Sequence, residues 1–268
     1  MTDKGKTSLL GPEEPAAVEV VNPKGRSRFV LTCEHAGRSV PASLNGLGID
    51  PGELARHIAW DIGAAATARR LSEQLDAPLV MQRYSRLVLD CNRPLDVPSL
   101  IPEVSDGTVI PANADLSAEE REARVNALFR PYHGAIEHIL DERDGEQPCS
   151  LLFSVHSFTP KLSVNPDARP MHLGLLFMSD PLALAMKAVL DGMDHPYTVT
   201  LNAPYRAGLG SDYTVPVHGE ERGLPNMLLE IRNDQIDTPK KARAMGDFLA
   251  QVLRKVDAEF GHTLTMAH

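Results

Sequence analysis

The chain has 268 residues and is 43% hydrophobic, so it can bury a sizeable core and is not globally disordered. Its net charge of −9 and its lack of a Lys/Arg-rich run argue against a nucleic-acid-binding protein, but leave room for a small anionic ligand. No apolar run reaches the roughly 18 residues that a membrane span needs. Three cysteines (Cys33, Cys91 and Cys149) without a disulfide or CxxC zinc pattern, and no recognisable secretory leader, predict a cytoplasmic protein.

The chain divides into a short tail and one domain. Residues 1–18 mix Gly, Pro and charge without periodicity and are predicted to form a poorly ordered tail, followed by a single domain over residues 19–268. Strands are expected near residues 28–33, 78–83, 86–90, 150–155, 172–178, 197–201 and 226–231. Helices are expected near residues 52–76, 117–143, 181–192 and 239–259. This alternation predicts an α/β fold whose central sheet is at least partly parallel.

Local signals refine the second of these helices. Ser117 and Glu120 form an S-x-x-E capping box at its start, and Pro131 is predicted to kink or interrupt it. The preceding stretch 94–116 is rich in Pro, Ser and Asp and is expected to be a long loop, which is often a functional feature.

Four of the predicted strands end in ionisable side chains. Ligands of open α/β sheets bind outside the carboxyl ends of the strands, so the groups that follow each apolar run are candidate site residues. The runs deliver, in chain order, Glu34 and His35; Asp90, Asn92 and Arg93; His156; and Glu230 and Arg232.

His35 and His156 are candidate zinc ligands, or else hydrogen-bonded histidines near the surface. Asp61 lies on an apolar stripe of its predicted helix, where a carboxylate is costly unless it is paired or binds a metal. His57, four residues earlier, is either a partner of Asp61 or a ligand in its place. His35, Asp61 and His156 would leave a fourth position open for water, which is the pattern of a catalytic zinc site.

Glu230 and several arginines are candidates for the chemistry around such a metal. Glu230 lies in the apolar run MLLEI and is either a general base beside a metal-bound water or part of a structural ion pair. Arg93, with Asn92, can bind a substrate carboxylate through its planar guanidinium, or pair with an aspartate. Arg86 and Arg232 are reserve candidates for the same role.

The remaining cysteine and histidine candidates are weaker. Cys33 stands two residues before His35, and Cys–His pairs drive acyl transfer, but its place at the end of an apolar strand favours packing. His133 and His138 fall in the interrupted helix and are expected to be structural. His218 is a candidate pocket-loop residue.

Five segments, in the same order along the chain, resemble the N-formylglutamate amidohydrolase family. They are CEHAG (33–37), HIAWDIGA (57–64), SRLVLDCNRP (85–94), SVHSFTP (154–160) and GLPNMLLEIRND (223–234). The resemblance implies a phosphorylase/hydrolase-like three-layer α/β fold with a mixed, mostly parallel sheet, related to zinc carboxypeptidases and aspartoacylase-type deacylases. It also implies metal-dependent hydrolysis of a small N-acyl amino acid, with N-formyl-L-glutamate as the first candidate.

The resemblance carries residue roles as well. His35 and His156 match the metal-binding histidines of the family, Glu230 matches its catalytic carboxylate, and Asn92-Arg93 resembles the pair that binds substrate carboxylate in the related deacylases.

One ligand position departs from the pattern of those deacylases. They use a His-x-x-Glu pair, whereas Arg38 stands three residues after His35 in this chain. The acidic ligand must therefore come from elsewhere, and Asp61 is the first choice, with Glu34 in reserve. Two alternative functions remain open: a zinc peptidase or cell-wall-type amidase on the same scaffold, and a catalytically silent protein that binds acyl amino acids.

Overall fold

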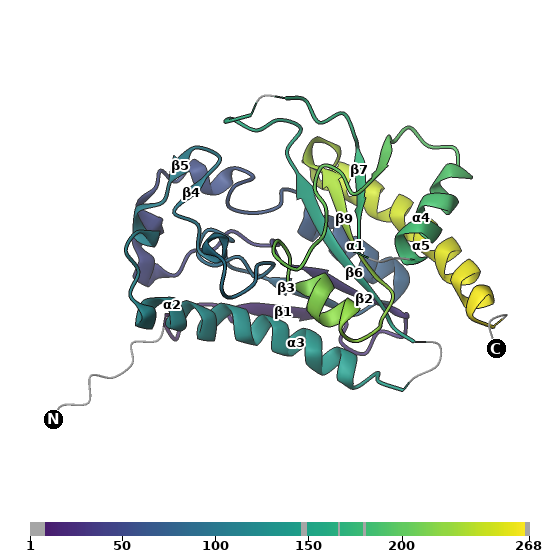
Figure 1. Ribbon diagram of the computed structural model, residues 1–268, viewed down its shortest axis with the longest axis horizontal. Coiled ribbons are helices and arrows are strands. Elements are labelled where there is room, and N and C mark those ends of the chain that lie inside the picture. The colour runs from purple at the N-terminus through teal and green to yellow at the C-terminus, as the bar shows by residue number, and fades with distance from the viewer. Residues whose placement is uncertain (1–8, 146–148, 166, 179–180, 266–268) are drawn as a thin grey trace.

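The computed structural model describes residues 9–145, 149–165, 167–178 and 181–265, which form a seven-stranded sheet covered by helices (Figure 1). The strands are β1 (Val18–Val21), β2 (Phe29–Cys33), β3 (Leu79–Gln82), β6 (Leu151–Phe158), β7 (Leu173–Leu176), β8 (Val199–Leu201) and β9 (Asn226–Arg232), with β4 (Val104–Ser105) and β5 (Thr108–Val109) in a separate hairpin. The α-helices are α1 (Ala64–Leu75), α2 (Ala118–Arg124), α3 (Arg130–Asp141), α4 (Pro181–Asp191) and α5 (Pro239–Thr265). Short 3₁₀ segments cover Ala42–Gly48, Glu53–Ala55, Pro98–Leu100, Pro111–Asn113 and Asn233–Gln235.

The sheet is mixed and mostly parallel, as expected from the sequence. Its order is β1-β3-β2-β6-β9-β7-β8. The four central strands β3, β2, β6 and β9 run parallel to one another, while β1 pairs antiparallel with β3 and β7 pairs antiparallel with β9. The carboxyl ends of the four parallel strands therefore lie at one edge of the sheet, where a ligand site is expected.

Helices cover both faces of the sheet and complete the three-layer fold. Alternate residues of a strand point to opposite faces, so Phe29 and Leu31 of β2 pack with α1, α4 and α5, while Val30 packs with α3. Figure 1 shows the same separation, with α3 on one side of the sheet and α4 and α5 on the other. Among the described residues, no helix combines the length and hydropathy that a membrane span requires.

The strand predicted at 86–90 is absent, and this prediction was wrong. The segment forms turns in which the backbone N–H groups of Val88 and Leu89 donate to the carbonyl oxygen of Ser85. Its leucines are nevertheless buried beside α3. A short apolar run buried in a loop has the same sequence pattern as a short strand.

The helix predicted at 52–76 begins only at Ala64, so the prediction of an α-helix over residues 52–63 was also wrong. Residues 56–63 form turns, and Gly63, with φ of 83°, precedes the helix. Asp61 therefore lies in a turn and not on a helical stripe. A side chain at Gly63 is excluded because a Cβ there would lie 2.1 Å from the carbonyl oxygen of Ile236.

Gly63→Ala is expected to lower the free energy of unfolding by about 2 kcal/mol or more, because alanine is strained at positive φ and would displace the Ile236 backbone. Urea unfolding measures the change. Gly134→Ala is the matched control: Gly134 lies on the exposed face of α3 with open space around it, so alanine there should stabilise by about 0.5–1 kcal/mol. Equal effects of the two substitutions would contradict the packing described for Gly63.

The other predicted helices are present, and the capping box is confirmed. The Ser117 hydroxyl accepts from the Glu120 backbone N–H, and the Glu120 carboxylate accepts from that of Ser117. The predicted interruption is a π-helical turn, Val125–Phe129, followed by α3 with Pro131 in its first turn. A second π turn covers Val215–Glu220.

The segment predicted as a tail is packed over the part that the structure describes. The Tyr84 hydroxyl donates to the carbonyl oxygen of Pro15 at 2.9 Å, Ala17 is buried, and β1 begins at Val18. Residues 1–8 lie outside the described residues. Periodicity did not reveal this short edge strand because it is only partly buried and contains a charged residue.

Candidate metal and substrate site

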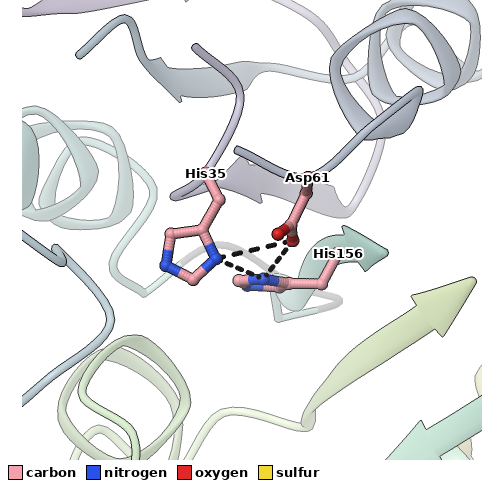
Figure 2. A group of neighbouring side chains, drawn as sticks. All are labelled: His35, Asp61 and His156. Atoms are coloured by element: carbon pink, nitrogen blue, oxygen red, sulfur yellow. Dashed lines mark hydrogen bonds and ion pairs between the residues drawn. The ribbon is translucent and has the colours of Figure 1, made fainter. Parts of the chain in front are cut away.

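Three side chains from different elements converge beyond the carboxyl end of β2. His35 follows β2, His156 lies in β6, and Asp61 lies in the turn before α1. The Nδ1 atoms of the two histidines are 3.1 Å apart, and the Oδ2 atom of Asp61 lies 3.4 Å from that of His35 and 2.9 Å from that of His156. Figure 2 shows the three polar ends pointing toward one another.

Each imidazole has a carboxylate on its outer side. The Nε2 atom of His35 lies 2.6 Å from Asp90 Oδ1, and that of His156 lies 2.7 Å from Glu34 Oε2. Carboxylates in this position hold the proton on Nε2 and leave Nδ1 as an inward-facing ligand atom. Glu34 therefore supports His156 from outside the cluster, so the structure does not place it among the converging ligand atoms.

The two outer carboxylates remain charged although they are buried. Burial alone raises the pKa of Asp90, but Arg86 and His35 outweigh it and hold the pKa well below its usual range. Burial likewise raises the pKa of Glu34, and the adjacent His156 imidazole outweighs that effect and leaves the pKa lowered. Both carboxylates can thus orient an imidazole at neutral pH.

The converging atoms fit a divalent cation such as Zn²⁺. Two imidazole nitrogens and one carboxylate oxygen are the donor types that zinc prefers, and three protein ligands leave a position for water or substrate. Since both Nε2 atoms face carboxylates, the lone pairs of the two Nδ1 atoms and of Asp61 Oδ2 face one another at close range. A bound cation would relieve the resulting repulsion. Without a cation, a proton on His156 relieves it instead. Burial lowers the pKa of His156, but Asp61 and Glu34 outweigh burial and raise that pKa well above its usual value.

Asp61 reaches this position through backbone contacts. Its N–H donates to the carbonyl oxygen of His35 at 2.9 Å, and its Oδ2 accepts from the Ser157 N–H at 3.0 Å. Gly37 assists because the chain there passes so close to Arg83 that a Cβ would lie 1.9 Å from the Arg83 carbonyl oxygen. The turn before α1 is therefore tied to the ends of both β2 and β6.

Glu230 is the next carboxylate along the sheet. It pairs with His156 in the β6–β9 register and lines the same cavity. Burial raises its pKa to about 8, and the neighbouring Asp61 carboxylate adds to the rise, while His156 and Arg86 oppose it. A cation bound beside it would lower that pKa and favour the carboxylate form.

The cavity that contains these groups has a volume of about 220 Å³. It is smaller than the roughly 300–1,000 Å³ typical of sites for drug-sized ligands, which favours a small metabolite. Its charged lining residues are Asp61, Asp212, Glu230, Arg86, Arg93 and Arg206.

The cavity arginines that the sequence indicated already have partners. The Nη2 atom of Arg86 lies 2.6 Å from Asp90 Oδ2, and its Nη1 lies 3.3 Å from His35 Nδ1. The Nη1 atom of Arg93 donates to the carbonyl oxygens of Ser211 and Asn92 and lies 4.0 Å from Asp212. The Nη2 atom of Arg93 has no protein partner in the described part of the chain.

Asn92 uses its amide to hold the cavity wall. Its Nδ2 donates to Asp212 at 3.0 Å, and its Oδ1 accepts from the backbone N–H groups of Tyr213 and Thr214, both at 3.1 Å. The amide that the resemblance assigned to substrate is thus occupied by the protein itself.

Two further candidates lie away from the cavity. Arg232 binds Asp234, with its Nε 2.8 Å from Oδ1, and donates to the carbonyl oxygens of residues 169–171. His218 is buried with its Nε2 2.9 Å from His133 Nδ1. Strand alternation predicted that Arg232 shares a face of the sheet with Glu230. It did not predict that Arg232, the last residue of β9, binds Asp234 and nearby carbonyl oxygens instead of lining the cavity.

His57 lines the cavity but does not contact Asp61. Its Nε2 lies 3.4 Å from Asp106 Oδ2, at the tip of the β4–β5 hairpin. The i, i+4 contact with Asp61, one of the two alternatives for His57, does not form because the two residues share no helix. Asp106, which also accepts from Arg56 and from the Ser163 backbone, ties the long loop 94–116 to the cavity rim.

Cys33 is a packing residue. It is fully buried among the side chains between the sheet and α1, and burial raises the pKa of its thiol well above the usual value. A neutral, buried thiol is a poor nucleophile.

Several site residues were missed. The loop after β8 contributes Tyr205, Arg206 and Asp212 to the cavity lining. No spacing or apolar run in the sequence marks these positions, because whether they line the cavity depends on the path of the loop in the folded protein.

Asp90→Asn is expected to lower the affinity for Zn²⁺ by about 10- to 100-fold, because His35 loses the charged partner that orients it. Competition with a chromophoric chelator measures the affinity. Asp191→Asn, an exposed residue of α4 paired with Lys187, is the matched control and should retain wild-type affinity. An Asp90 variant with wild-type affinity would mean that this carboxylate does not orient His35.

The comparisons with known proteins agree with the resemblance read from the sequence. A model of the N-formylglutamate amidohydrolase family matches residues 27–236. A Pseudomonas putida protein named N-formylglutamate deformylase is 27% identical over 145 residues, which are 50% of this chain and 53% of that protein. The matched region therefore spans about half the length of that relative.

Two solved structures have the same fold. A gene product from Agrobacterium tumefaciens is 38% identical with a TM-score of 0.89, and the match covers 94% of this chain and 99% of that chain. An N-formylglutamate amidohydrolase from Ralstonia eutropha JMP134 is 19% identical with a TM-score of 0.66, and the match covers 91% and 98% of the two chains. The second likeness concerns the fold alone.

Proposed function

Since the chain belongs to the N-formylglutamate amidohydrolase family, we propose that it hydrolyses the amide bond of a small N-acyl amino acid, with N-formyl-L-glutamate as the first candidate substrate. The products are then formate and L-glutamate. The observation that carries the proposal is the convergence of His35, Asp61 and His156 in the cavity that Glu230 also lines.

His35, Asp61 and His156 would hold Zn²⁺ or another divalent cation. Such a cation supplies a Lewis acid that polarises a carbonyl and lowers the pKa of water to about 7. Asp90 and Glu34 keep the two imidazoles in the orientation that this requires.

Glu230 moves the protons. Its carboxylate takes a proton from the attacking water as the oxygen bonds to the acyl carbon, and it later delivers that proton to the amide nitrogen as the C–N bond breaks. Its burial suits this role, because a carboxylate with a raised pKa can both accept and return a proton near neutral pH.

Arg86 and Arg93 complete the electrostatics of the site. The Arg86 guanidinium, 3.3 Å from His35 Nδ1, places positive charge beside the acyl group and stabilises the developing oxyanion. Arg93 binds the substrate α-carboxylate through its Nη2 atom, while its Nη1 stays on the protein carbonyls.

The deciding experiment measures formate release from N-formyl-L-glutamate, together with metal content, before and after chelator treatment. We expect formate release that chelation abolishes and added Zn²⁺ restores. Activity that survives complete metal removal would overturn the metal-dependent mechanism, and no turnover of any small N-acyl amino acid would overturn the proposed reaction.

Two alternatives are separated by the same assay. A cell-wall-type amidase or peptidase on this scaffold would release products from peptidoglycan fragments, which the small cavity disfavours. A catalytically silent binding protein would bind the acyl amino acid when loaded with Zn²⁺ but release no formate. The cytoplasmic location expected from the sequence stays a prediction.

A further inference from the structure

The cavity has a wall formed by the loop after β8. Tyr205, Arg206, Ser211 and Asp212 of this loop line the cavity together with Arg93 and Glu230. Asp212 anchors one end of the wall, since its Oδ2 accepts from the Gly208 N–H at 3.1 Å and its Oδ1 accepts from Asn92.

Tyr205 anchors the other end. Its hydroxyl accepts from Arg169 Nη1 at 2.7 Å, and the Arg169 guanidinium lies 5.0 Å from the centre of its ring. Because the hydroxyl oxygen accepts this bond, its own proton remains available for a ligand. Arg206 is the next residue in the chain and is therefore held between two anchored points.

Arg206 differs from the other two cavity arginines in its lack of a partner. Arg86 is paired with Asp90, and Arg93 is bonded to two carbonyl oxygens. Arg206 makes no hydrogen bond and no ion pair with any residue that the structure describes. An arginine that lines a cavity without a protein partner is available to bind an anion.

The charges of the cavity show which anion it would bind. The lining contains three carboxylates, of Asp61, Asp212 and Glu230, and three guanidiniums, of Arg86, Arg93 and Arg206. Arg86 belongs to the metal-side cluster and Arg93 is assigned to the α-carboxylate, so Arg206 is the arginine of the described lining that remains for a second carboxylate on the substrate. Without it, Asp212 would repel that carboxylate.

We propose that Arg206, assisted by the Tyr205 hydroxyl, binds the side-chain carboxylate of the substrate and thereby makes the site selective for N-acyl derivatives of acidic amino acids. This inference rests on the proposed function, which requires only an N-acyl amino acid. It adds the residue that selects the acidic side chain of the substrate.

The test compares two nearly isosteric substrates, N-formyl-L-glutamate and N-formyl-L-glutamine, on the Zn²⁺-loaded protein. Wild type is expected to prefer the glutamate compound in kcat/KM. Arg206→Gln should lower that preference by roughly 10- to 100-fold, because a charge-assisted bond is lost, and most of the decrease should fall on the glutamate compound. Arg206→Lys should restore part of the preference.

A matched control is Arg130→Gln, which removes an exposed arginine at the start of α3 that contacts Glu122 outside the cavity. It should leave the preference at the wild-type value. An equal loss on both substrates in Arg206→Gln, or no change in the preference, would overturn the inference.

Binding separates failure of this inference from failure of the proposed reaction. Titration calorimetry gives the affinity of the Zn²⁺-loaded protein for the same two compounds. If wild type turns over neither compound but binds the glutamate compound more tightly, and Arg206→Gln loses that difference, the selectivity stands while the reaction is wrong. Equal affinity of wild type for both compounds would overturn the selectivity whatever the turnover.

Discussion

Replacing His35 with alanine is expected to lower the affinity for Zn²⁺ by at least about 100-fold and to abolish formate release, since one of the three side chains proposed to bind the metal is lost. Metal content after loading and dialysis, together with chelator competition, measures the first effect. His35 is a better choice than His156 because its outer partner, Asp90, keeps the ion pair with Arg86 when the imidazole is removed. Removal of His156 would instead take away the imidazole beside the fully buried Glu34 carboxylate, which also accepts from the Ser154 hydroxyl.

The matched control is His138→Ala, which removes an exposed histidine of α3 that contacts only Glu142 in the described structure, at 3.5 Å. It should bind Zn²⁺ and release formate like wild type. A His35 variant that retains one tightly bound Zn²⁺ per chain would show that the metal lies elsewhere, and the convergence of the three ligand atoms would then need another explanation.

Replacing Glu230 with glutamine is expected to lower kcat by about 10²- to 10⁴-fold, because an amide of the same shape cannot take the proton of the attacking water. The affinity for Zn²⁺ should stay close to that of wild type, since Glu230 is not one of the three converging ligands. Steady-state kinetics of formate release and chelator competition measure the two quantities on the same preparation.

Glu142→Gln, an exposed change on the far side of the sheet from α5, serves as the matched control and should leave kcat at the wild-type value. Retention of more than a tenth of kcat in Glu230→Gln would assign the proton transfer to another group. The two variants together separate metal binding from chemistry, because His35→Ala removes both, whereas Glu230→Gln removes only turnover.

Asp61 is buried beside both histidines, as expected, although the helix predicted around it is absent. Its apolar neighbours indicated a buried carboxylate, and it is buried beside both histidines. The helix that was expected to bury it does not exist there, because Gly63 turns the chain before α1. Burial and chemical type were readable from the local sequence, while the local conformation depended on a contact with the distant Ile236 backbone.

The support of the two imidazoles was harder to foresee. Glu34 and Asp90 were identified as polar groups near strand ends, but which nitrogen each would face depends on side-chain direction. Asp90 does not follow a strand: it lies in a loop, where it contacts both His35 and Arg86. His35 and Asp90 are in contact although they are 55 residues apart in the sequence, and such a contact leaves no local sequence pattern.

By itself, the sequence determined the α/β class, the two strands near whose carboxyl ends His35 and His156 lie, and the family motifs, because apolar periodicity and residue type are local properties of the chain. Only the tertiary structure decided that Asp61 joins the two histidines, that Asn92 and Arg232 bind other parts of the protein, and that Arg206 lines the cavity without a partner among the described residues. Those outcomes depend on which loops cross the carboxyl end of the sheet and on whether another protein group lies close enough to bind each polar side chain. The groups that pair in this way are distant along the chain, so no local sequence pattern reveals them.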